Sequence, residues 1–107
     1  MTTLFEYDVF LPTQDNLGAP YPPAILARVK EQLVQHFGGV TDFRHKSEGQ
    51  WRLGDIVFRD EIVLLRALGE DNHKHRRFLR GLQRELEARM KQSEILIIER
   101  EVQRLDS

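Results

Sequence analysis

The chain has 107 residues, of which 40% are hydrophobic and 31% charged, and its formal net charge is −1. Domains of about 100 to 150 residues are typical, so we expect residues 1–107 to form a single domain around one modest core. The small net charge gives no overall attraction to nucleic acid or membranes, and the absence of cysteine excludes disulfides, thiolate catalysis and zinc sites that need sulfur.

The first predicted element is a strand over residues 4–11. Its odd-numbered residues are aromatic or aliphatic, whereas Glu6 and Asp8 place two acids in the middle of the other face. Pro12 ends the strand, because proline cannot donate a hydrogen bond to a sheet ladder. Residues 13–23 are rich in proline and contain a glycine, which predicts a loop.

A helix starting at Ala24 is the clearest local signal in the chain. Two prolines precede it, and proline suits a helix entry because its missing N–H would have no partner there. The apolar residues that recur with helical spacing are Leu26, Val29, Leu33 and Phe37. Gly38-Gly39 predicts the helix end, since glycine readily adopts the left-handed conformation found there.

Two strands are predicted next. The first covers residues 40–44 and resumes at residues 50–53, and the glycine-containing polar break between the two parts is typical of a bulged edge strand. The second, residues 62–68, is apolar on both faces, so we expect it in the middle of a sheet. The chain is expected to reverse at Gly54-Asp55 or at Arg59-Asp60-Glu61, and the latter is most simply a charged turn.

A second helix and a last strand complete the chain. Asp71-Asn72 can cap the helix, whose apolar stripe consists of Leu79, Leu82, Leu86 and Met90. Gly81 inside this helix indicates close packing at that point, because glycine there costs about 1 kcal/mol relative to alanine. Residues 94–105 predict a long final strand that opens with the apolar run Ile95-Leu96-Ile97-Ile98.

The element order β-α-β-β-α-β predicts an α+β fold, the ferredoxin-like sandwich. It has a four-stranded antiparallel sheet with the first and third strands at its centre and two helices on one face. Val63, Leu65 and Ala67 would meet the helices. The opposite, open face would carry Leu4, Glu6, Asp8, Phe10, Ile62, Leu64, Arg66 and Leu68. Monomers rarely leave so large an apolar patch in water, so we expect a second copy to cover it, sheet against sheet. The alternative is that the loop of residues 13–23 or the C-terminal tail folds over it.

Glu6, Asp8 and Arg66 are the candidate catalytic residues, with Glu99 as a further candidate neighbour. Two carboxylates two positions apart on one strand face can share a proton or hold a divalent ion. The simpler interpretation is an ion pair in which Arg66 compensates acids that would otherwise be buried without a partner.

Trp51 and Arg52 are candidate ligand-binding residues. The indole ring could stack on a ligand ring or base while Arg52 supplies a charge. A single tryptophan next to a glycine on a strand more simply fills a core or a dimer interface.

The second predicted helix is basic, with seven positive residues against two negative ones from Asn72 to Lys91. The candidate residues for binding an anion or nucleic acid are Lys74, Arg76, Arg77, Arg80 and Arg84. Cations near a helix start oppose the helix dipole, and such a conflict can mark an anion site. The alternative is a solvated outer face, partly paired with Glu70, Asp71, Glu85 and Glu87.

No metal site and no cofactor is predicted. His73 and His75 would diverge by roughly 200° around a helix, and no phosphate-binding glycine loop or nucleophile motif occurs. No apolar run approaches the roughly 20 residues of a membrane span, and the first residues resemble no leader, so we expect no membrane contact and a cytoplasmic location.

Three short motifs resemble families of small uncharacterised bacterial proteins, a domain of unknown function: Phe37-Gly38-Gly39-Val40-Thr41, Gly49-Gln50-Trp51 and Asp60-Glu61-Ile62-Val63. The resemblance covers residues 4–98, implies a ferredoxin-like fold and supplies no known activity. Tyr7-Asp8-Val9 is similar to the end of the first strand in CRISPR-associated adaptation nucleases of ferredoxin-like fold, which would make Asp8 a metal-binding acid. The proline-rich loop replaces that family's arginine-rich segment, and the second strand bears a different motif.

The leading functional interpretation is a non-catalytic binding or oligomerisation module that forms a homodimer through the open face. The second is a nucleic-acid-binding protein or metal-dependent nuclease that uses the basic helix together with Asp8 and Glu6. The third is a small-molecule enzyme in a dimer cavity, with Glu6 or Asp8 as general base and Arg66 holding an anion.

Overall fold

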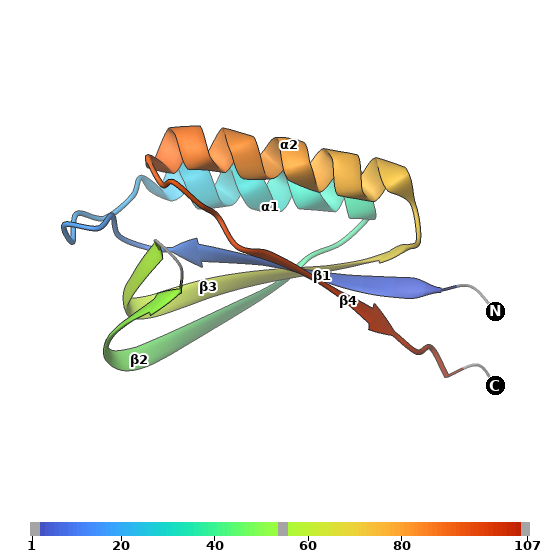
Figure 1. Ribbon diagram of the computed structural model, residues 1–107, viewed down its shortest axis with the longest axis horizontal. Coiled ribbons are helices and arrows are strands. Elements are labelled where there is room, and N and C mark those ends of the chain that lie inside the picture. Colours follow the sequence, from blue (N-terminus) through green and yellow to red (C-terminus); the bar gives the residue numbers. More distant parts are fainter. Residues whose placement is uncertain (1–2, 54–55, 106–107) are drawn as a thin grey trace.

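The computed structural model describes residues 3–53 and 56–105, without the side chains of residues 47–51, 53, 59 and 60. Its elements are β1 (Leu4–Pro12), α1 (Pro23–Phe37), β2 (Thr41–Leu53), β3 (Ile56–Glu70), α2 (His73–Met90) and β4 (Ile97–Val102). The strands form one antiparallel sheet in the order β2-β3-β1-β4, and both helices lie on one side of it (Figure 1). The predicted α+β, ferredoxin-like fold, with the first and third strands at its centre, is confirmed. Neither described helix combines the length and apolar character that crossing a membrane requires.

Both helices begin where the sequence predicts, within one residue, and α1 also ends where predicted. Pro23 occupies the first turn of α1, and Gly38 ends it in the left-handed conformation with φ of 89°. The side chain of Asn72 caps α2 by accepting a hydrogen bond of 2.7 Å from the backbone N–H of Lys74. These local signals position the two helices over the same face of the sheet.

The main core lies between the helices and the sheet. Val63, Leu65 and Ala67 of β3 are buried, as predicted for residues that face the helices, and Tyr7 and Val9 of β1 pair beside them. The helices contribute Val29, Leu33, Leu79, Leu82, Leu86 and Met90 to the buried layer. The strand residues that alternate with these, among them Glu6, Asp8 and Arg66, therefore point away from the helices, to the open face.

The β2–β3 hairpin confirms two expectations and overturns a third. As predicted, β2 is an edge strand, and its pairing with β3 is irregular between Lys46 and Gln50. The predicted charged turn at Arg59-Asp60-Glu61 is wrong, because these residues lie inside β3. The strands instead end on either side of residues 54 and 55, which lie outside the described part of the chain. Ile56, Val57 and Phe58 are all buried, so extending the hairpin places apolar side chains in contact.

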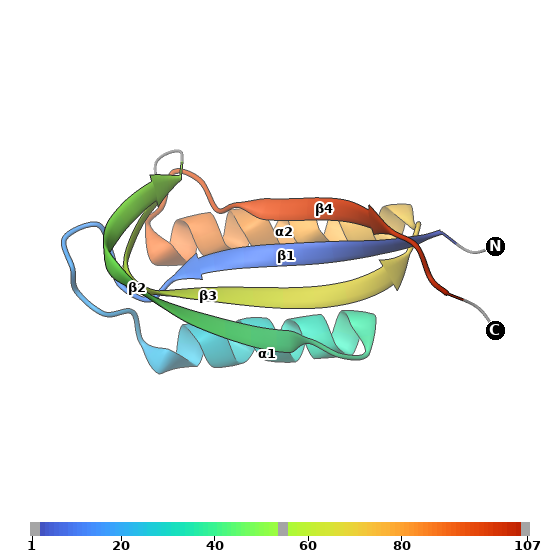
Figure 2. The same cartoon turned by 90° about the horizontal axis from the view of Figure 1, so that it is seen from below.

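The far end of this hairpin covers one end of the open face. Figure 2, which views the sheet from below, shows the hairpin curling across the end of β1 toward the segment that leads into β4. Ile56, Phe58 and Ile62 form a second buried cluster there, with Phe10 and Leu96 packed against it. We call these five residues the covered part of the open face.

Neither of the two segments expected to cover the open face does so. The loop before α1 folds back on itself through the hydrogen bond from the Tyr21 N–H to the Thr13 carbonyl, and the Tyr21 hydroxyl donates to the carbonyl of Met90 at the end of α2. Leu105 in the C-terminal tail is exposed. The cover therefore comes from the hairpin.

β4 is shorter than the strand predicted over residues 94–105. Gln83 of α2 donates a hydrogen bond of 2.6 Å to the carbonyl of Ile95, and the Ile95 side chain is completely buried in the main core. The Ile95 carbonyl therefore bonds to α2 and not to a neighbouring strand, and regular pairing of β4 with β1 begins at Ile97.

The close packing predicted at Gly81 is wrong. A Cβ at Gly81 would meet nothing within 4 Å, whereas one at Gly69 would lie 2.9 Å from the imidazole of His75 and 3.2 Å from the ring of Phe37. Close packing therefore requires a glycine at Gly69, at the end of β3 beside the start of α2.

Candidate functional site

Asp8 lies at the centre of the open face and is almost completely buried. Its neighbours across the sheet are Arg66 of β3 and Ile98 of β4. Arg66 donates two hydrogen bonds to the carboxylate, from Nε to Oδ1 at 2.8 Å and from Nη2 to Oδ2 at 3.1 Å. Arg100 adds a third, from Nη1 to Oδ2 at 3.3 Å.

Glu6 completes this charged cluster. Its carboxylate forms an ion pair with Arg66, and its Oε2 lies 3.5 Å from Nη1 of Arg100. Two carboxylates thus face two guanidinium groups, so the cluster is neutral overall. The sequence predicted that Glu6, Asp8 and Arg66 would lie together, which the structure confirms, but not the part played by Arg100. The placement of Glu99 near them is wrong, because Glu99 pairs with Tyr7 on the helix side of β1.

The electrostatics of the cluster limit its chemistry. Burial acts to raise the pKa of Asp8, but the hydrogen bonds from Arg66 and Arg100 outweigh it and hold the pKa below its ordinary value. The carboxylate of Asp8 stays ionised at neutral pH, and guanidinium groups occupy both of its oxygens. Within the described ranges, no group of three or more His, Asp or Glu residues is placed to hold a metal ion. This geometry matches structural charge compensation better than acid catalysis or metal binding.

Apolar side chains surround the charged cluster and remain in contact with solvent. Leu68 is 54% exposed and Phe43 is 44% exposed, and the guanidinium carbon of Arg66 lies 5.0 Å from the centre of the Phe43 ring. Four more apolar residues of this face are partly exposed: Leu4, Leu64, Ile98 and Val102. We call these six residues the uncovered part of the open face.

The candidate ligand pair Trp51 and Arg52 lies on the edge strand β2. The side chain of Trp51 falls outside the described residues, and Arg52 is exposed. A role for the indole ring in ligand binding stays a prediction.

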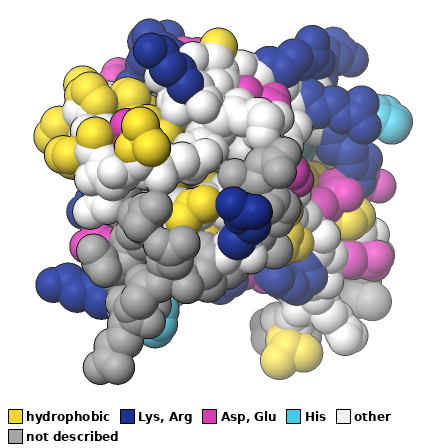
Figure 3. Space-filling view, turned by 60° about the vertical axis from the view of Figure 1, so that its left-hand side comes forward, with side chains coloured by type: hydrophobic (Ala, Val, Ile, Leu, Met, Phe, Trp, Pro, Cys, Tyr) yellow, Lys and Arg dark blue, Asp and Glu magenta, His cyan; other side chains and the backbone are white. Residues whose placement is uncertain are grey.

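Two basic residues of α2, Arg76 and Arg89, form ion pairs, and Nε of Arg89 lies 3.6 Å from Oε1 of Glu85. Nε of Arg76 donates a hydrogen bond of 2.7 Å to Oε1 of Glu99, and Nη1 of Arg76 lies 3.0 Å from Oδ1 of Asp71. For Lys74, Arg77, Arg80 and Arg84, which are exposed, the described part of the chain contains no acidic partner at ion-pair distance. Figure 3 shows Lys and Arg side chains gathered toward the top of the molecule, where the helix layer lies.

A small cavity of about 190 Å³ lies beside this basic helix. Tyr7, Arg76, Arg80 and Glu99 are among the residues that line it. Burial and the nearby Glu99 carboxylate raise the pKa of Tyr7 to about 12. The phenol is therefore neutral under ordinary conditions and cannot serve as a base.

A pair of histidines joins the two helices, and the sequence does not predict it. Nε2 of His36 lies 2.8 Å from Nδ1 of His75, and the His36 ring stacks on Phe78 with 4.1 Å between ring centres. Burial, followed by the charge of His75, lowers the pKa of His36. The two residues are 39 positions apart on different helices, so no local spacing relates them.

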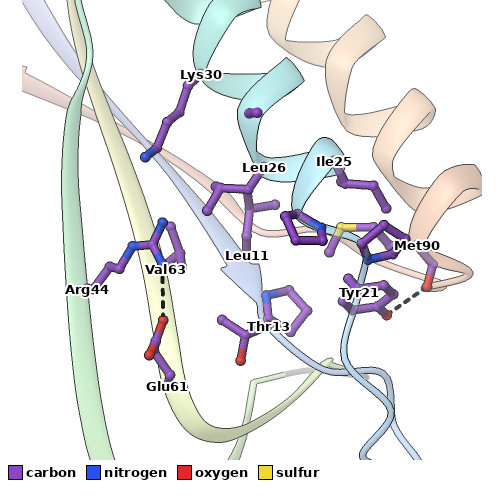
Figure 4. Close-up of a pocket in the computed structure, with 14 residues that line it drawn as sticks. Leu11, Thr13, Tyr21, Ile25, Leu26, Lys30, Arg44, Glu61, Val63 and Met90 are labelled. Atoms are coloured by element: carbon purple, nitrogen blue, oxygen red, sulfur yellow. Dashed lines mark hydrogen bonds and ion pairs between the residues drawn. The ribbon is translucent and has the colours of Figure 1, made fainter.

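An apolar cleft of about 390 Å³ lies on the helix side of the sheet, beside the start of α1. Figure 4 shows Leu11, Ile25, Leu26 and Met90 around it, with Lys30 and Arg44 extending toward the same side. The lining residues come from β1, the following loop, both helices, β2 and β3. Sequence reasoning missed the cleft because no local pattern brings these segments together.

Comparisons with known proteins establish the fold and no more. No protein-family model matches the sequence, and no curated protein matches it, so the resemblance to small bacterial proteins of unknown function stays a prediction. Among solved structures, a phage SAM lyase in complex with S-methyl-5'-thioadenosine is similar, with a TM-score of 0.67 and 10% sequence identity. The match covers 94% of this chain and 83% of that chain. At this identity the likeness supports the shared α+β architecture alone.

Proposed function

We propose that this chain is a non-catalytic module that binds a second copy of itself through the uncovered part of its open face. The observation that carries the proposal is the exposure of large apolar side chains there, above all Leu68 and Phe43. Water-exposed apolar patches of this kind are costly for an isolated chain and are typical of interaction sites. A two-fold axis would place the same patch of each copy against the other.

The charged cluster is compatible with such an interface. Glu6 and Asp8 are balanced by Arg66 and Arg100 within one chain, so two identical faces would meet without net repulsion. The partners of these groups are already in place, which lowers the cost of removing them from water. The apolar rim around the cluster would supply the favourable free energy of association.

The second interpretation, a nucleic-acid-binding protein or metal-dependent nuclease, has weaker support. A metal-dependent nuclease would need the oxygens of Asp8 and Glu6, which Arg66 and Arg100 contact. A nucleic-acid-binding surface would rest on Lys74, Arg77, Arg80 and Arg84, yet no aromatic side chain interleaves them on the exposed side.

The third interpretation, a small-molecule enzyme in a dimer cavity, is the other candidate function. The charged cluster on the open face favours it, because a second copy bound there would enclose the cluster and create a polar interior. The similar solved structure is a lyase bound to a small molecule, which shows that this architecture can support such chemistry in another protein. Its activity is not carried over to this chain.

Light scattering on a sizing column tests the proposal. We expect the wild-type chain to have about twice the 12.6 kDa mass of one copy, and Leu68→Glu to have the mass of one copy, because a buried unpaired carboxylate opposes association. Val34→Glu is the matched control, since Val34 is 44% exposed on α1, away from the sheet face. The control should keep the wild-type mass.

Two results would contradict the proposal. One is a wild-type chain that has the mass of one copy at every concentration. The other is an equal loss of mass in Leu68→Glu and Val34→Glu, which would place no specific interface on the open face. Circular dichroism of each variant establishes that the substituted chains remain folded.

A further inference from the structure

The apolar cleft beside the start of α1 has the size and lining of a ligand site. Its volume of about 390 Å³ falls within the roughly 300 to 1,000 Å³ that small-molecule pockets occupy. Leu11 and Val63 of the sheet, Leu26 of α1 and Met90 of α2 supply apolar surface. The cleft lies on the helix side of the sheet, so it is separate from the open face and does not depend on the function proposed above.

One wall of the cleft is held in place by hydrogen bonds. The Tyr21 hydroxyl donates to the carbonyl of Met90 at 2.8 Å and accepts from Nε2 of Gln92, also at 2.8 Å. Pro22 and Pro23 follow directly and also line the cleft. Because proline and a bonded tyrosine have little conformational freedom, this wall would lose little entropy when a ligand binds.

The opposite side of the cleft carries charged side chains, and they are not equally engaged. Lys30 forms a close ion pair with Asp42. Arg44 is held loosely, with Nε 3.5 Å from Asp42 and Nη1 3.6 Å from Glu61. Both distances exceed the range of about 2.7 to 3.2 Å for a good N–H···O hydrogen bond. The guanidinium of Arg44 therefore keeps donors available for another acceptor.

The attraction to an anion comes from the free donors of Arg44. Lys30, Arg44 and Glu61 line the cleft, and Asp42, which is not a lining residue, pairs with both cations, so the four charges balance. Burial acts to raise the pKa of Asp42, but the hydrogen bond and charge of Lys30 lower it overall, so the Lys30–Asp42 pair stays ionised and Arg44 is the side chain best placed to receive a ligand.

We infer that this cleft binds a small, mostly apolar molecule with one anionic group, such as a carboxylate. The apolar body contacts Leu11, Leu26 and Met90, and the anionic group accepts hydrogen bonds from Arg44. A guanidinium–carboxylate contact is charge-assisted and stronger than a neutral hydrogen bond. The site thus selects for both an apolar body and a negative charge.

A pair of matched probes tests this inference: 4-phenylbutyrate and its neutral amide, 4-phenylbutanamide, titrated into the full chain labelled with nitrogen-15. We expect phenylbutyrate to shift the amide resonances of residues that line the cleft, chiefly those of Leu26, Lys30 and Arg44. The neutral amide should bind at the same place about tenfold more weakly, as expected when one charge-assisted hydrogen bond is lost.

Two substitutions sharpen the test. Arg44→Gln should remove the preference for the anion without affecting the affinity of the amide, whereas Arg77→Gln, at an exposed position of α2, should change neither. Ala27→Trp adds bulk at an exposed residue that lines the cleft, so it should weaken both probes without disturbing the core.

Several outcomes would overturn the inference. These are the absence of any shift at millimolar phenylbutyrate, shifts centred on Phe43 and Leu68 of the open face, equal affinity for the two probes, and an anion preference that survives Arg44→Gln.

Discussion

The covered and uncovered parts of the open face contain similar side chains in different surroundings. Phe58 and Ile56 are completely buried because the far end of the β2–β3 hairpin turns over Phe10 and Leu96. Phe43 and Leu68, on the same two strands, remain 44% and 54% exposed. A strand that is apolar on both faces can therefore be covered by the hairpin to which it belongs. The hairpin buries only the residues that its curled end contacts, and the rest of the open face stays exposed.

The irregular pairing between Lys46 and Gln50 separates the curled end of the hairpin, which covers the sheet, from the part whose open face stays exposed. Bulges increase local twist and bend a strand, which allows the residues beyond this point to leave the plane of the sheet. Before it, β2 and β3 pair regularly from Thr41 to Lys46, and Phe43 and Leu64 stay in contact with solvent there, whereas Ile62 is buried. Arg66 of the charged cluster pairs with Thr41 in this regular part of the hairpin.

The largest expected effect is the loss of the Phe58 ring. Phe58→Ala should lower the free energy of unfolding by about 3 to 5 kcal/mol, because it leaves a cavity in a fully buried cluster. Phe43→Ala removes an equal volume from the uncovered part and should cost about 1 kcal/mol or less. Urea denaturation of both variants, at a concentration where the chain is a single species, measures the difference. Equal costs would show that the two parts are equally buried in solution.

Removal of Arg66 should have the next largest effect. Arg66→Met leaves Asp8 buried with only Arg100 as a partner, and we expect a loss of about 2 kcal/mol, less than for a fully buried pair because Arg66 is partly exposed. The control is Arg84→Met on α2, at an exposed position, which should change the free energy of unfolding by no more than about 0.5 kcal/mol. If both arginine variants were equally stable, Asp8 would not depend on its partner.

The acid dependence of stability should report on the same cluster. The pKa of Asp8 is lowered from 3.8 in the folded chain, so its contribution is fully present above about pH 3.8 and is lost as the pH falls below that value and through the folded pKa. Asp8→Asn should be less stable at neutral pH and show a flatter decline in this window. An unchanged slope in Asp8→Asn would assign the acid sensitivity to other carboxylates.

On the helix side, the histidine pair should give a smaller effect at higher pH. The folded pKa of His36 is lowered from 6.5 by burial and by His75, so the unfolded chain takes up a proton first. Stability should therefore fall as the pH drops below about 6.5. His36→Gln should reduce this decline and leave the window below pH 3.8 unaffected. A decline that persists in His36→Gln would show that His36 does not cause it.

The sequence predicted the elements whose signals are local. The stripe of Leu26, Val29 and Leu33, the terminal Gly38 and the cap at Asn72 each act within about two turns of a helix, and each appears where expected. The two-faced apolar character of residues 62–68 correctly predicted a central strand. Alternation along β1 and β3 was also sufficient to place Asp8 next to Arg66, since residues on one face of paired strands become neighbours.

What the sequence did not predict depends on contacts between distant segments. That Arg100, and not Glu99, joins the cluster of Glu6, Asp8 and Arg66 depends on the register of β4 against β1, which the uniformly apolar run at residues 95–98 leaves open. The curl of the hairpin depends on what Ile56 and Phe58 meet, and the His36–His75 contact depends on how the two helices pack. Gly81 lies on the exposed side of α2, which its residue type alone does not reveal.

Cysteine cross-linking tests the proposed interface most directly, because the chain contains no cysteine of its own. Single substitutions Leu68→Cys and Leu17→Cys place one thiol on the uncovered part of the open face or on the loop before α1, where Leu17 is 95% exposed. We expect mild oxidation to convert Leu68→Cys rapidly to a covalent dimer and Leu17→Cys only slowly, despite its greater exposure. Faster cross-linking of Leu17→Cys, or equal rates for the two, would contradict association through the open face.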